Sequence, residues 1–157
     1  MAATQTWQPL ERDALAARLA QDIPEGWSVN LGIGIPTLVG NYVPPEREVI
    51  FHSENGDLAN WARSEDDNAP AIGGAMDLAA GARRIWVVME HNTRSGEPRL
   101  LRRCSYPLTA KACVSRVYTE LAVIDVTPRG FAVVDMVPGL SLEELQARTD
   151  APLHIPV

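Results

Sequence analysis

Short runs of β-branched residues alternate with helical segments along this chain, and this alternation constrains the fold more than any other feature. Leu15, Leu19 and Ile23 recur at four-residue spacing in an alanine-rich segment. This spacing predicts an amphipathic helix that ends at residues 24–26, where Pro, Glu and Gly follow one another. A strand is expected next, at residues 27–31.

The remaining strands are predicted from short Val- and Ile-rich runs bounded by polar residues. Residues 49–52 and 84–90 have the composition of buried strands. Residues 119–126 and 131–137 form a further pair, joined by the turn sequence Thr-Pro-Arg-Gly at 127–130. The pair is therefore expected to be a hairpin.

Two more helices are predicted from their start signals. Pro36, after a glycine-rich turn, suits the first position of a helix that runs to about Tyr42. Residues 141–144, Ser-Leu-Glu-Glu, have capping-box spacing and open a last helix to about Thr149. Together the segments predict the α/β class, with an open, mostly parallel sheet and flanking helices.

Composition limits the number of domains and the class of partner. The 157 residues, 46% of them hydrophobic, suffice for one domain with its own core, so we expect residues 1–157 to form a single domain. The net charge of -6, without a basic block, argues against a nucleic-acid partner or an anionic membrane surface. The apolar runs are too short to cross a bilayer, and residues 1–7 have no secretory pattern, so a cytoplasmic setting is expected. Cys104 and Cys113 lack the spacing of a metal or disulfide framework.

Glycine and polar residues follow the predicted strands at their carboxyl ends, where open α/β sheets bind ligands. The segments concerned are residues 32–37, 52–56 and 90–92. Gly73 and Gly74 precede a predicted helix start, where bare backbone amides suit an oxyanion or a phosphate group. These segments therefore hold the candidate site residues.

Each candidate also has a purely structural interpretation. Gly32 and Gly34 lack the third glycine of a dinucleotide fingerprint, so a tight turn is the default and a small nucleotide-binding domain is the weaker alternative. His52 and His91 have no ligand spacing and are more typical of hydrogen-bonded structural residues. Glu54 alone is typical of a solvated loop charge.

Three motifs that occur in a fixed order favour a functional interpretation of these residues over the structural one. They are S-E-N-G at 53–56, G-G-A-M-D-L at 73–78 and P-L-T-x-x-x-C-V at 107–114. With the flanking segments, the sequence from about Leu10 to Leu153 resembles the B-type subunit of the family I CoA-transferases, one of the two kinds of chain in these enzymes. The resemblance is greatest to the members of the family that act on 3-oxoadipate, with other 3-oxoacid enzymes next.

The resemblance implies transfer of CoA from an acyl-CoA, typically succinyl-CoA, to a free 3-oxoacid. It implies the A-type CoA-transferase subunit as partner and requires no metal or prosthetic group, since acyl-CoA is a substrate. It places the covalent nucleophile on Glu54, which would become a glutamyl-CoA thioester. The other site residues that it implies are Gly73 and Gly74 for an oxyanion, Asn55 beside the nucleophile, and Gly32 and Gly34 along the same edge.

The sequence departs from the family pattern directly after the S-E-N-G motif. Family members carry a sizeable block between this motif and the segment G-D-L-A-N-W, whereas here Gly56 serves both motifs and Asp57 follows directly. The chain is therefore expected to be internally shortened near residues 56–57. A natural shortened relative, an internal deletion and a segment left out of the recorded sequence all fit this junction. A shortened chain could also act as a non-catalytic assembly partner of the A-type subunit.

Overall fold

The structure is a computed structural model that describes residues 6–25, 27–31, 34–39, 41–42, 50–53, 81–103 and 110–156. The helices and strands in chain order are α1 Arg12–Asp22, β1 Ser28–Leu31, α2 Ile35–Val39, β2 Ile50–Ser53, β3 Ile85–Val88, β4 Val114–Tyr118, β5 Ala122–Thr127, β6 Gly130–Met136, α4 Leu142–Gln146 and β7 Leu153–His154.

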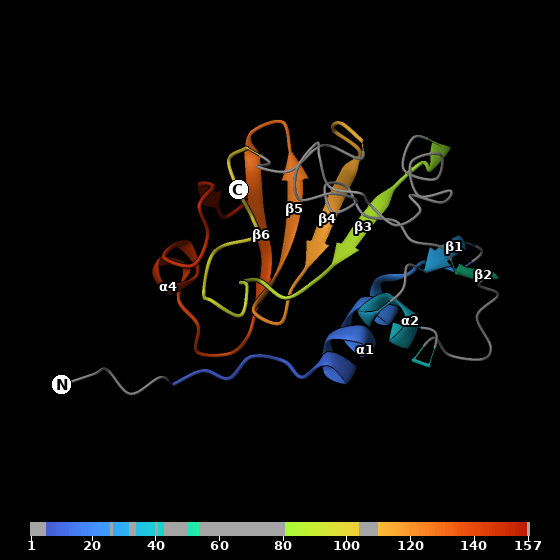
Figure 1. Ribbon diagram of the computed structural model, residues 1–157, viewed down its shortest axis with the longest axis horizontal. Helices are drawn as coiled ribbons and strands as arrows, with labels where there is room; N and C mark the ends of the chain where they lie inside the picture. Colours follow the sequence, from blue (N-terminus) through green and yellow to red (C-terminus); the bar gives the residue numbers. More distant parts are fainter. Residues whose placement is uncertain are drawn as a thin grey trace.

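The described strands form two sheets. Strands β3 to β7 lie in chain order in a five-stranded sheet, in which β3–β4 and β6–β7 are parallel and the pairs between them antiparallel. Strands β1 and β2 form a separate parallel pair. Figure 1 shows β3 to β6 side by side, with α4 next to β6 and with β1 and β2 on the side of β3. Among the described strands β3 pairs only with β4, so its other edge has no partner there.

The predicted hairpin is present as β5 and β6. Thr127 pairs with Gly130 across the turn, and the Thr127 hydroxyl donates a hydrogen bond to the Gly130 carbonyl at 2.9 Å. Gly130 has a φ of 107°, which an L side chain rarely adopts, so the glycine permits the turn. A register shift between Val123 and Ile124 bends the pair.

Helix α1 covers one face of the five-stranded sheet. Its apolar side buries Leu15 and Leu19, which pack with Tyr118 of β4 and Val123 of β5. The same cluster takes in Val39 of α2, so α2 lies beside α1. The helix-period spacing of the leucines explains why one face of α1 meets the sheet.

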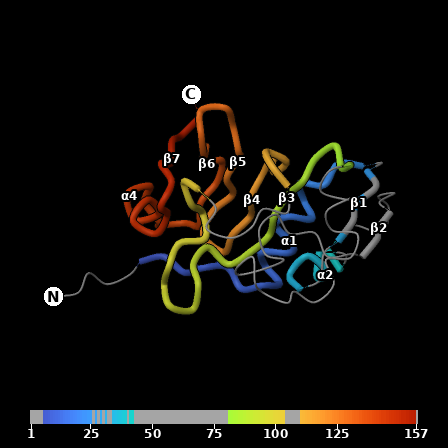
Figure 2. Tube along the Cα trace, turned by 45° about the horizontal axis from the view of Figure 1, so that its top comes forward, coloured from blue at the N-terminus to red at the C-terminus, as the bar shows by residue number. Residues whose placement is uncertain are grey.

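The opposite face of the sheet is covered by α4 and by the segment before α1. The largest core cluster holds Val117, Ile124 and Val133 from three strands, Leu145 from α4, and Trp7. Figure 2 shows α4 and β7 beside β6, at the far end of the molecule from β1 and β2. Alternate residues of β4 and β5 therefore serve two different cores, as the two-residue period of a strand requires.

Most predicted elements are present, with shifted bounds. The last helix has the predicted capping box, because the Ser141 side chain accepts from the Glu144 amide and the Glu144 side chain accepts from the Ser141 amide. The helix expected to reach Tyr42 ends at Val39, and β4 and β7 were not predicted. The α/β class with a mostly parallel sheet is confirmed, since three of the five strand pairs are parallel. Within the described residues no helix is long and apolar enough to cross a membrane.

Candidate functional site

The parallel pair β1–β2 sets side by side the strand ends that precede Gly32 and Glu54, two of the predicted site residues. Leu31 pairs with Ser53 at the carboxyl ends of the two strands. Gly32 follows Leu31 and Glu54 follows Ser53, so the chain enters both segments from adjacent positions. Glu54, Asn55, Gly32, Gly73 and Gly74 themselves lie outside the described residues.

Gly34 is the one predicted site residue that the structure describes. Its φ of 105° confirms a turn that requires glycine. The Thr37 hydroxyl donates to the Gly34 carbonyl at 2.6 Å, and the Thr37 amide donates to the same oxygen at 3.1 Å. The turn thus leads into α2, as expected from Gly34 and Pro36.

Charged residues gather where β3 ends. Glu90 accepts a hydrogen bond from Arg12 of α1 at 2.6 Å, and Arg99 lies 3.9 Å from its other oxygen. The hydrogen bond from Arg12 lowers the pKa of Glu90, so this carboxylate is charged at neutral pH. Next to Arg12, Asp13 accepts a hydrogen bond from the Tyr42 hydroxyl at 2.8 Å. The first turn of α1 therefore contacts the residues that follow both α2 and β3.

His91, the next residue, is fully buried and has a partner on each ring nitrogen. Its Nδ1 lies 3.0 Å from the Thr119 hydroxyl and its Nε2 lies 2.9 Å from the Thr149 hydroxyl. Burial, together with the positive charge of Arg148, lowers the pKa of His91 from 6.5 to about 4. The ring is therefore neutral at pH 7 and connects three segments. This confirms the structural interpretation of His91, while the side chain of His52 lies outside the described residues.

Glu120 is a second carboxyl group at this end of the sheet. It is partly buried and accepts a hydrogen bond from the His91 amide at 2.8 Å. Burial raises the pKa of Glu120, against the opposite effect of this hydrogen bond. Glu90 and Glu120 thus have opposite pKa shifts. Among the described residues no cluster of His, Cys, Asp and Glu could hold a metal ion.

An ionic network on β4 and β5 was not predicted from the sequence. Arg116 of β4 makes two parallel hydrogen bonds to Asp125 of β5, and its guanidinium also reaches Asp22 at 3.4 Å. Asp22 accepts a second hydrogen bond from Tyr118 at 2.7 Å. Val117 and Tyr118 of β4 are buried, and the β-branched and aromatic residues of the run Val-Ser-Arg-Val-Tyr at 114–118 were the sequence signal for this missed strand.

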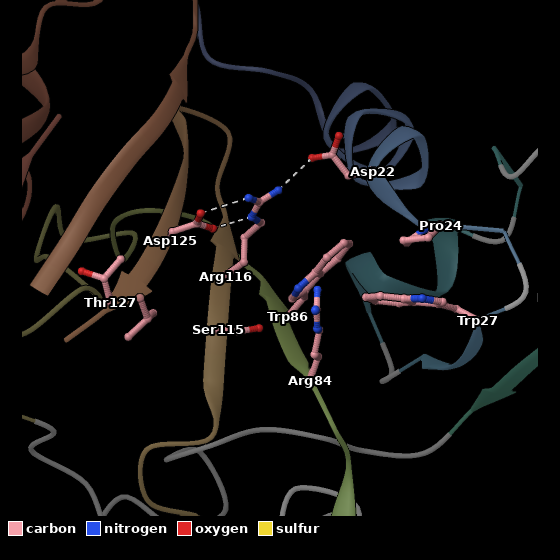
Figure 3. Close-up of a pocket in the computed structure, with 10 residues that line it drawn as sticks. Asp22, Pro24, Trp27, Arg84, Trp86, Ser115, Arg116, Asp125 and Thr127 are labelled. Carbon is pink, nitrogen blue, oxygen red and sulfur yellow. Dashed lines mark hydrogen bonds and ion pairs between the residues drawn. The ribbon is translucent and has the colours of Figure 1, made fainter. Parts of the chain in front are cut away.

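The same network borders an open cavity of about 440 Å³. Figure 3 shows Trp27, Trp86 and Arg84 on one side of it, and Arg116 reaching Asp125 and Asp22. The cavity lies at the amino ends of β1, β3 and β4, because Trp27 precedes β1 and Arg84 precedes β3. It is therefore at the opposite strand ends from Gly34 and Ser53.

A family profile described as "Coenzyme A transferase" matches residues 52–148. The chain belongs to the coenzyme A transferase family. The matched range begins within β2 and ends just after α4. The enzyme class inferred from the three sequence motifs, CoA-transferase of the 3-oxoacid type, is confirmed by this membership.

Bacterial relatives match the CoA-transferase chain along almost its whole length. The B-type subunit of the 3-oxoadipate CoA-transferase of Acinetobacter baylyi is 36% identical over 210 residues, which cover 94% of this chain and 97% of the relative. The Pseudomonas putida protein of the same name is 38% identical, with 92% and 96% covered. The B-type subunit of the succinyl-CoA:3-ketoacid coenzyme A transferase of Helicobacter pylori is 29% identical, with 92% and 99% covered.

The fold also resembles a solved structure. An acyl-CoA transferase apoenzyme of Escherichia coli O157:H7 superposes with a TM-score of 0.72 at 15% identity. The superposition covers 99% of this CoA-transferase chain and 43% of the solved chain, so the protein spans less than half the length of that structure. At this identity the likeness shows the shared fold alone.

Proposed function

We propose that this chain is the B-type subunit of a CoA-transferase that moves CoA from succinyl-CoA to a 3-oxoacid, with 3-oxoadipate as the first candidate. The observation that carries the proposal is the 36% identity to the corresponding chain of a 3-oxoadipate CoA-transferase, across 97% of that relative. Two relatives named for succinyl-CoA and a 3-ketoacid support the same donor and the same class of acceptor. The S-E-N-G motif at 53–56 supplies the nucleophile.

The proposed reaction is a sequence of acyl transfers through Glu54. The Glu54 carboxylate attacks the thioester carbonyl of succinyl-CoA, the carbon–sulfur bond breaks, and CoA leaves as a thiolate. The thiolate then attacks the glutamyl carbonyl of the resulting anhydride, which releases succinate and leaves a glutamyl-CoA thioester. The carboxylate of the 3-oxoacid repeats the two steps in reverse and leaves as the new thioester. No oxidation or reduction takes place, and the proposed steps require no metal or prosthetic group.

The surrounding residues would stabilise the charge that develops on the reacting carbonyl. We assign the oxyanion contact to the backbone amides of Gly73 or Gly74, and the orientation of Glu54 to Asn55. The register of Leu31 with Ser53 supports a shared edge for Gly32, Gly34 and Glu54, because these residues follow adjacent strand ends. At such an edge, the backbone of the two glycines would lie close to the substrate.

We place this chain in a complex with the A-type CoA-transferase subunit in the cytoplasm. The relatives are named as one kind of subunit, which supports a second kind of chain as partner. That partner would supply the rest of the acyl-CoA site, since this chain spans 43% of the solved acyl-CoA transferase.

The test combines adduct mapping with turnover. We expect the complex incubated with succinyl-CoA alone to carry a CoA adduct on Glu54 that hydroxylamine removes, as detected by peptide mass spectrometry. Glu54→Gln should lower turnover by at least about a thousandfold without preventing assembly, because it removes the nucleophile. Glu97→Gln, at an exposed position, is the matched control and should retain full turnover. A folded complex that turns over without an adduct on Glu54 contradicts the mechanism.

The second candidate is a non-catalytic assembly partner of the A-type subunit. It is favoured by the length of the match to the Acinetobacter baylyi relative, since 210 aligned positions exceed the 157 residues of this chain. The relative therefore has a stretch without counterpart here, in agreement with the junction at residues 56–57. A stable complex with the A-type subunit that neither binds CoA nor forms an adduct would establish this second function.

A further inference from the structure

We propose that the cavity at the amino ends of β3 and β4 binds a small ligand in which a flat ring carries an oxyanion. The cavity is lined by Asp22, Pro24, Trp27, Arg84, Trp86, Ser115, Arg116, Asp125, Val126 and Thr127. Its volume of about 440 Å³ falls within the range of pockets that hold small organic ligands. The site lies at the opposite strand ends from the proposed CoA-transfer site and does not depend on it.

Arg84 determines the charge that the cavity accepts. Its guanidinium lies 5.3 Å from the centre of the Trp27 ring, and its side chain forms no ion pair with the described residues. Figure 3 shows this side chain beside the two tryptophans. An arginine without a carboxylate partner retains donors for two parallel hydrogen bonds to a carboxylate or phosphate. The ligand group that faces Arg84 is therefore an oxyanion.

The acidic residues of the cavity already have partners. Arg116 pairs with both Asp125 and Asp22, while Arg18 and Tyr118 also bind Asp22. These carboxylates are consequently neutralised and do not compete for Arg84 or attract a free cation. An anionic ligand thus meets one unpaired positive charge and no unpaired negative charge among the lining residues.

The two tryptophans provide the surface for a ring. Trp27 and Trp86 have ring centres 5.5 Å apart with an angle of 49° between their planes, and Trp86 continues to Tyr118 at 5.6 Å. Both tryptophans are partly exposed and line the cavity, with Arg84 over the ring of Trp27 and Arg116 5.7 Å from the ring centre of Trp86. A flat ring gains offset or edge contacts with such a pair beyond its apolar burial.

The experiment is calorimetric titration of the full chain with three probes that share one ring. We expect 2-naphthoate, 2-naphthyl phosphate, or both, to bind saturably at one site, and uncharged 2-naphthamide to bind at least about tenfold more weakly. Binding of only one anion identifies its group, carboxylate or phosphate, as the preferred oxyanion. Equal affinity for 2-naphthamide, or no saturable binding of either anion, overturns the proposal.

A pair of adjacent variants distinguishes the cavity from a general charge effect. Arg84→Gln should weaken binding of the anionic probe at least about tenfold, because it removes the charge-assisted hydrogen bonds. Arg83→Gln removes the same charge from the neighbouring exposed position, which does not line the cavity, and should change the affinity less than about twofold. Equal losses in the two variants, with unchanged circular dichroism, place the probe elsewhere and refute the site.

Discussion

Helix α1 is bound to the sheet by ion pairs at both of its ends, and the two ends differ in burial. At its start Arg12 pairs with Glu90 beyond β3, and these side chains are 65% and 36% exposed. At its end Asp22 meets Arg116 of β4, with exposures of 25% and 24%. The first pair is shorter, 2.6 Å against 3.4 Å, yet it lies in water.

The difference shows that burial and shared partners matter more than distance. Exposed pairs contribute little, because water and salt screen them and two long side chains lose freedom. Asp22 instead accepts hydrogen bonds from Arg116, Arg18 and Tyr118, and Arg116 also binds Asp125 with two of its nitrogens. We therefore expect removal of one member at the end of α1 to leave other groups unpaired.

The largest effect is expected at His91, the buried residue that follows Glu90 in the chain. Burial and Arg148 lower the pKa of His91 to about 4, whereas the unfolded chain takes up the proton near pH 6.5. The neutral ring therefore contributes stability that is complete above pH 6.5 and is lost as the pH falls toward 4. The loss amounts to about 3 kcal/mol.

The measurement for His91 is urea unfolding between pH 4 and 7. His91→Gln should lack this part of the pH dependence, while other acidic groups keep their own contributions. His154→Gln, at a partly buried position in β7, is the control for the substitution itself. If His91→Gln and the wild type have equal slopes, burial and Arg148 do not hold the ring neutral.

A smaller loss is expected from Arg116→Met. The substitution keeps the length of the apolar stem and leaves Asp125 without its bidentate partner, at a cost of about 2 kcal/mol in the free energy of unfolding. Arg116→Lys should recover only part of it, because an ammonium group cannot form two parallel hydrogen bonds. Arg129→Met, in the exposed turn after β5, is the control and should be neutral. If Arg116→Met leaves the free energy of unfolding unchanged, the more buried pair at the end of α1 stabilises the protein no more than the exposed pair at its start.

The sequence predicted local structure well where a single pattern decided it. The capping box at Ser141 and Glu144, the β5–β6 turn with Gly130, and the glycine turn at Gly34 are set by the residues themselves. Strand β4 was missed because Arg116 stands in it as a charge, and only its contacts with Asp125 and Asp22 make that position favourable. Such contacts join residues far apart in the chain, and no local pattern contains them.

The candidate site also has parts that the sequence predicts and parts that it does not. The S-E-N-G motif predicts Glu54 as the nucleophile by resemblance, and the structure describes the pairing of Leu31 with Ser53, the residues before Gly32 and Glu54. The roles of Glu54, Asn55, Gly73 and Gly74 stay predictions, since these residues lie outside the described part. The cavity of Trp27, Trp86 and Arg84 was not predicted, because its lining residues come from four segments, at 22–27, 84–86, 115–116 and 125–127, that meet only in the fold.

The smallest effect is expected from Arg12→Gln, which breaks the pair with Glu90 at the start of α1. Glu90 then keeps Arg99 at 3.9 Å and remains open to water, so no buried charge is left alone. We expect the unfolding midpoint to stay unchanged at physiological salt and to fall slightly at low salt, where screening is weak. Urea titrations at two salt concentrations measure both values. A loss at Arg12 as large as that at Arg116, independent of salt, would show that the first turn of α1 depends on this pair despite its exposure.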